Sequence, residues 1–144
     1  MIGHYTSLMD ELKSEHRQLL EVFGRMKKSG ESEDAAEFQQ ALADFKGLLV
    51  PHVVKEAYKV YTYLRQYYKD KGDAEVYRRV TGYKTEMTGI GDAALKFIDA
   101  HERAAPDAID FANVNESLRE IGLLLGDRIR REEAFLYPLY HTTE

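Results

Sequence analysis

Apolar side chains recur every three or four residues through most of the chain, and this spacing constrains the fold more than any other feature. Such a period places the apolar residues along one face of an α-helix, whereas a half-buried β-strand would need strict alternation. We find four stretches of this kind and no convincing alternating run, so we expect an all-α protein. The apolar positions extend from Tyr5 to Met26, from Phe38 to Tyr67, from Val76 to Phe97 and from Val114 to Leu139.

Polar linkers at 28–33, 69–73 and 104–107 separate the four stretches. Asp34 is placed to cap the second helix, with Glu37 reaching back to it in a capping box. Pro51 lies inside that helix and predicts a kink between residues 47 and 51. Because short linkers favour antiparallel neighbours, we predict a single domain over residues 1–144, folded as an up-down-up-down antiparallel four-helix bundle.

Composition narrows the classes of function. The 20 Lys and Arg residues and 25 Asp and Glu residues are interspersed and give a net charge of −5, which does not favour nucleic-acid binding. There is no cysteine, so disulfides and thiolate metal ligands are excluded. Neither a secretory signal nor an apolar run of roughly 18 residues occurs, so we expect a cytoplasmic protein with no membrane contact. No nucleophilic triad or phosphate-binding loop is discernible, and we expect no enzymatic activity.

The chain contains an internal repeat of one helical hairpin. The segment from His52 to Leu64 matches the segment from Arg128 to Tyr140 at a glutamate and at the aliphatic–tyrosine pair four residues beyond it. Residues 15–19 match residues 86–90 more weakly. The second and fourth helices therefore carry related sequences, as do the first and third.

Equivalent positions of this repeat place polar side chains on the inward stripes of the helices. Burying an unpaired charge costs several kcal/mol, so such a layer is stable only if its members pair with one another or bind a metal. Residues four apart share a helix face, so His52 can act together with Glu56, and Arg128 with Glu132. The inward positions of the layer are His16, His52, Glu56, Met87, Arg128 and Glu132.

A histidine on the first helix, an HxxxE pattern on the second and the segment Arg-Arg-Glu-Glu-Ala-Phe-Leu-Tyr-Pro on the fourth resemble the hemerythrin-like, or HHE cation-binding, domains. These bundles hold a non-haem di-iron centre that binds oxygen or senses oxygen, nitric oxide or iron. The likeness covers nearly the whole chain. Carried over by position, it implies metal ligation by His16, His52, Glu56 and Glu132.

Two positions depart from the family pattern, because Met87 and Arg128 stand where the family has histidines. Methionine is a poor iron ligand, and a protonated guanidinium offers no lone pair. We therefore expect either a metal-free layer, in which Arg128 pairs with Glu56 or Glu132, or a single iron on the remaining ligands. We expect either of these two arrangements in preference to a complete di-iron centre.

The resemblance implies a metal-binding protein or a sensor of oxygen, nitric oxide or redox state. The alternative is a metal-free regulatory bundle that binds another protein, similar in general form to the bacterial regulators that sequester the housekeeping sigma factor. Tyrosines crowd the second helix and cannot all be buried on one face. The surplus at Tyr58, Tyr61 and Tyr68 is a candidate surface for a protein partner or for self-association, unless these tyrosines only pack against a neighbouring helix.

Overall fold

The computed structural model describes the backbone of residues 2–143 and the side chains of residues 8–143, so the side chain of Tyr5 lies outside the described residues. The helical elements are α1 (Ile2–Glu31), α2 (Ala35–Glu56), η1 (Ala57–Tyr61), α3 (Thr62–Asp70), α4 (Ala74–His101), η2 (Pro106–Ala108), α5 (Phe111–Arg131), η3 (Glu132–Leu136) and α6 (Tyr137–His141). The elements η1 and η3 are π-helical turns, and η2 is a short 3₁₀ turn.

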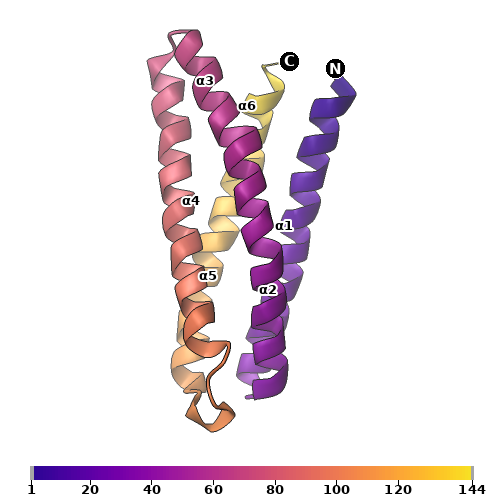
Figure 1. The fold of residues 1–144 in the computed structure, drawn as a ribbon, viewed down its shortest axis with the longest axis vertical. Helices are drawn as coiled ribbons and strands as arrows, with labels where there is room; N and C mark the ends of the chain where they lie inside the picture. The colour runs from indigo at the N-terminus through magenta and orange to yellow at the C-terminus, as the bar shows by residue number, and fades with distance from the viewer. Residues whose placement is uncertain (1, 144) are drawn as a thin grey trace.

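These elements form four long bundle helices, and the predicted all-α four-helix bundle is confirmed. The first is α1, the second is α2 continued by η1 and α3, the third is α4, and the fourth is α5 continued by η3 and α6. The helices run up and down in alternation, so that both termini lie at the same end of the bundle (Figure 1). Around the bundle, α1 packs beside α2 and α5, and α4 packs beside α2, α3 and α5.

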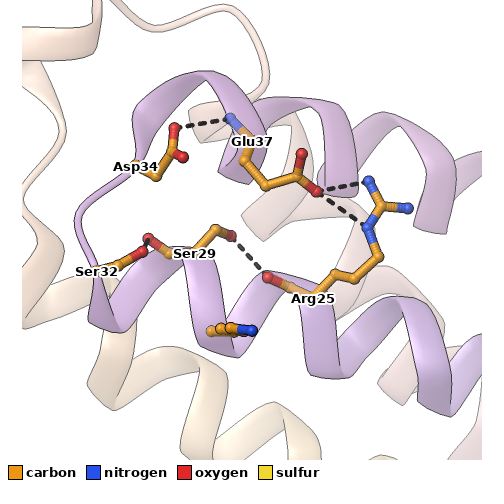
Figure 2. Close-up of a pocket in the computed structure, with 6 residues that line it drawn as sticks. Arg25, Ser29, Ser32, Asp34 and Glu37 are labelled. Carbon is orange, nitrogen blue, oxygen red and sulfur yellow. Dashed lines mark hydrogen bonds and ion pairs between the residues drawn. The ribbon is translucent and has the colours of Figure 1, made fainter.

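Aspartates begin three of these helices. Asp34, Asp73 and Asp110 each accept the backbone N–H of the third following residue at 3.2 Å, which satisfies a donor that the helix itself cannot pair. The predicted cap at Asp34 is therefore confirmed. The side chain of Glu37 does not complete a capping box, because it binds the guanidinium of Arg25 instead (Figure 2).

The second bundle helix departs from α-geometry at another place than expected. The helix α2 continues through Pro51, and the wide π-turn η1 follows six residues later, directly after Glu56. A second π-turn, η3, starts at Glu132, the residue equivalent to Glu56 in the internal repeat. Both irregular turns thus flank the polar layer, as π-turns often do at functional sites.

Two apolar clusters fill the bundle, one on each side of the polar layer. The cluster toward the α1–α2 loop includes Leu19, Phe23, Phe38, Phe45, Ile98 and Leu118. The cluster toward the termini includes Met9, Leu12, Leu64, Val80, Leu136 and Tyr137. Among the described residues, no helix is both long and apolar enough to cross a membrane.

Candidate functional site

The structure brings the predicted polar side chains together in the middle of the bundle. His16 comes from α1, His52 and Glu56 from α2, and Glu132 from η3, and each is at most 3% exposed. One ligating atom from each of these four residues lies within 4.8 Å of the others. The interior position and the grouping expected from the sequence are therefore both present.

Two tyrosines cross-connect the layer. The Tyr61 hydroxyl donates to Oε2 of Glu132 at 2.6 Å, and the Tyr137 hydroxyl donates to Oε2 of Glu56 at 2.5 Å. Each hydroxyl thus binds the glutamate of the other repeat unit. Burial and the neighbouring carboxylates raise the pKa of both phenols, which keeps them protonated as donors.

Tyr61 was one of the candidates for the tyrosine surface, but it is only 2% exposed. An unbroken α-helix advances about 100° per residue and would turn Tyr61 away from the layer. The wider turn η1 takes up one additional residue and rotates Tyr61 inward. The signal was visible in the repeat, because the same aliphatic–tyrosine pair follows both glutamates.

Arg128 supplies a permanent positive charge inside the layer. Its side chain is fully buried, and Nε lies 3.3 Å from Oε2 of Glu132. The guanidinium also donates to the Tyr61 hydroxyl and stacks over the Tyr83 ring at 4.5 Å from the centroid. The expected ion pair is therefore formed with Glu132, while Glu56 takes the Tyr137 hydroxyl.

Half-exposed charges from the neighbouring helices form an outer shell that follows the same repeat. Glu15 accepts from Nδ1 of His52 at 2.6 Å and also binds Lys55. At the equivalent positions, Glu86 lies 3.7 Å from Nη1 of Arg128 and also binds Arg131. Sequence reasoning missed this shell, because Glu15 and Glu86 lie beside the inward stripe and not on it.

The two buried glutamates differ in protonation. Burial and the adjacent carboxylate of Glu132 raise the pKa of Glu56 well above its ordinary value. Burial acts in the same direction on Glu132, but hydrogen bonds from His16 and Glu56 and the charge of Arg128 outweigh it and lower the pKa of Glu132 to about 2. Two like charges this close cannot both ionise, so Glu56 keeps its proton and Glu132 carries the negative charge.

The two histidines also differ. Burial disfavours the charged ring of His16, yet its 3.1 Å contact with Glu132 and its 2.7 Å contact with Glu133 outweigh burial and raise the pKa of His16. Burial dominates at His52 and lowers its pKa. The layer therefore sets the positive charge of Arg128 and the more basic ring of His16 against Glu132 and the partly exposed Glu133.

This arrangement does not fit the di-iron centre that the resemblance implies. Met87 is buried at its position but brings no ligand of the kind iron prefers. Arg128 places its guanidinium against Glu132, one of the implied ligands. That His16, His52, Glu56 and Glu132 bind an ion stays a prediction, which metal analysis of the purified protein would test.

The fold and this layer define an all-α bundle whose buried charges are paired among its own side chains. The model of the family described as "Regulator of RNA polymerase sigma(70) subunit, Rsd/AlgQ" matches residues 1–140. The chain belongs to this family. No curated protein and no solved structure matches the chain.

The family match corrects the main functional reading of the sequence. The assignment to the hemerythrin-like family was wrong, and with it the interpretation as an iron-binding or oxygen-, nitric oxide- or redox-sensing protein. The HxxxE pattern is genuine, but here it builds a layer of ion pairs and hydrogen bonds. The alternative reading, a regulatory bundle of the sigma-factor type, is the one that the family supports.

The predicted surface of Tyr58, Tyr61 and Tyr68 must also be corrected. Tyr61 and Tyr68 are buried, at 2% and 8% exposure, and only Tyr58 of the three stands clear of the bundle, at 74%. Tyr68 packs in the cluster near the termini. A surface made of all three tyrosines therefore does not exist.

Proposed function

We propose that this protein binds the sigma-70 subunit of RNA polymerase directly and limits the amount of that subunit available to the core enzyme. The family match over residues 1–140 carries this proposal. The described fold supports it, because the bundle offers long, continuous helix faces to a protein partner. A cytoplasmic location follows from this function, since RNA polymerase works there.

The burial of the polar layer supports a structural role for it in this function. Its side chains are nearly all buried and bound to one another, so they are not placed to contact a macromolecule. We infer that the protein acts by binding and not by catalysis. Binding energy would then come from the outer faces of the helices, with the layer holding those faces in a fixed arrangement.

Titration calorimetry with purified sigma-70 subunit tests the proposal. We expect saturable binding of one protein to the other, and none to an alternative sigma factor of an unrelated class. In transcription from a sigma-70 promoter, adding the protein before core enzyme should lower transcript yield. Adding it to preformed holoenzyme should have a smaller effect. Absence of binding to sigma-70, with folded protein confirmed by circular dichroism, would refute the proposal.

A gel-shift measurement addresses the expected lack of nucleic-acid binding. With a net charge of −5 and no basic stripe, the protein should leave duplex DNA unshifted at low salt, where electrostatic binding is strongest. A shift that disappears with added salt would show direct contact with the phosphate backbone.

A further inference from the structure

The exposed residues on the outer side of α2 from position 40, together with Tyr58 of η1, form a long surface without charge. We call it the α2 face, and define it by the exposed residues from position 40 to position 58: Gln40, Ala43, Gly47, Val50, Pro51, Val54 and Tyr58. Val50, Val54 and Tyr58 stand at successive intervals of four residues and are 39%, 49% and 74% exposed. Exposed apolar side chains gathered in this way mark protein-binding surfaces.

Charges on the flanks of α2 turn toward neighbouring helices and leave this face free. Asp44 binds Arg25 of α1 at 2.9 Å. Lys55 binds Glu15 of α1, and Lys46 lies 3.4 Å from Asp99 of α4. The neutrality of the α2 face is thus maintained by ion pairs along both of its edges.

The outer faces of the other long helices carry exposed charges. On α1 they include Arg17 and Glu21, and on α4 they include Arg78 and Lys96. The fourth bundle helix exposes Leu123 and Leu124, but Arg119, Glu120 and Arg130 are exposed within two turns of them. The exposed residues of the α2 face are all uncharged, and Lys59 borders the face beyond Tyr58.

The described residues leave this face uncovered. At 1.5 Å per residue and a width of about 10 Å, the α2 face measures about 27 Å by 10 Å, roughly 300 Å². A lasting dimer buries about 800 Å² per partner, so this area suits one helix in a reversible complex better than a second copy of the chain.

We propose that the α2 face receives an apolar helix of the sigma-70 subunit, with Tyr58 at one end of the face as its main anchor. This inference rests on the proposed function and adds the surface through which it acts. Tyrosine is enriched among residues that dominate binding energy, and helix-on-helix recognition reads side chains spaced by three and four residues. A regulator that must release its partner needs a contact of this limited size.

Calorimetry with the wild type and three variants tests the assignment. Val54→Asp places a charge between Val50 and Tyr58 and should weaken sigma-70 binding by at least about tenfold, as should Tyr58→Ala. The matched control is Leu123→Asp on α5, where the leucine is 71% exposed. It should bind within about twofold of wild type. Circular dichroism and light scattering on each protein verify fold and mass.

Each outcome separates the two proposals. If wild type does not bind sigma-70, the proposed function fails and the α2 face with it. If wild type binds and both α2-face variants bind equally well, the function stands and the α2 face is wrong. Loss of binding by Leu123→Asp alone moves the contact to α5. A wild-type dimer that Val54→Asp converts to a monomer shows that a second copy occupies the face, and it overturns the assignment.

Discussion

Replacing Arg128 with leucine tests the interpretation of the polar layer most directly. The change places an apolar side chain at a fully buried position and removes the cation that lies 3.3 Å from Glu132. Breaking a buried ion pair by removing one partner costs about 3–5 kcal/mol, because the other charge is left uncompensated. Glu132 still keeps the Tyr61 hydroxyl at 2.6 Å and His16 at 3.1 Å.

Because these contacts remain, we expect a loss near the lower end of the 3–5 kcal/mol range, at about 3 kcal/mol in the free energy of unfolding. Urea denaturation followed by far-ultraviolet circular dichroism measures it, provided that the slope with denaturant does not change. The matched control is Arg130→Leu, at a side chain that is 73% exposed and pairs only on the surface with Asp127. It should stay within about 0.5 kcal/mol of wild type.

A double variant isolates the role of charge. Combining Arg128→Leu with Glu132→Gln removes the stranded carboxylate, and the double variant should be more stable than Arg128→Leu alone. A loss below about 1 kcal/mol in the free energy of unfolding of Arg128→Leu would refute the account of the layer as a coupled set of charges. So would a double variant whose loss of stability equals the sum of the losses of the two single variants.

Two further predictions concern helix packing and pH. A Cβ on Gly122 would lie 2.8 Å from the Phe23 ring, so Gly122→Ala should lower the free energy of unfolding by about 1–3 kcal/mol. A Cβ on Gly126 would have no atom within 4 Å, so Gly126→Ala should raise the free energy of unfolding by up to about 1 kcal/mol. Equal effects in urea denaturation would contradict the close approach of α1 and α5. Glu132 and Glu133 raise the pKa of His16 against the effect of burial, so this ring stabilises the fold fully below pH 6.5, and its contribution is lost as the pH rises through its folded-state pKa. His52, whose pKa burial lowers, acts in the opposite direction below pH 6.5. His16→Gln should flatten the decline in stability above pH 6.5, and an unchanged pH profile would show that the His16 ring is neutral in the fold.

Much of the fold follows from the spacing of apolar residues. The period of three and four residues, the linkers and the capping aspartate at position 34 together predict the bundle and the interior positions of His16 and Glu132. These features are local or repeat along one helix face, so a sequence displays them directly. The π-turn after Glu56 is different, because it accompanies a contact of Tyr61 with a carboxylate 71 residues away, which no local spacing displays.

The position of the polar layer and the pairing of Arg128 with Glu132 were predicted, whereas metal ligation by the layer stays a prediction. The same residue types, His16 with HxxxE, satisfy either a metal ion or a set of internal ion pairs, and their spacing alone does not choose between them. Arg128 was the informative departure, because a buried guanidinium must be matched by acceptors. The outer shell of Glu15 and Glu86 depends on how neighbouring helices are rotated, which no single stripe specifies.

The crossed tyrosine contacts have a mechanical consequence. Since Tyr61 and Tyr137 each reach the glutamate of the opposite bundle helix, sliding one helix past the other by one turn, about 5.4 Å, would detach both hydroxyls at once and remove a donor from each buried carboxyl. The two crossed contacts thereby hold the second and fourth bundle helices in one lengthwise alignment. A surface carried on such a frame loses little conformational entropy when another protein docks on it.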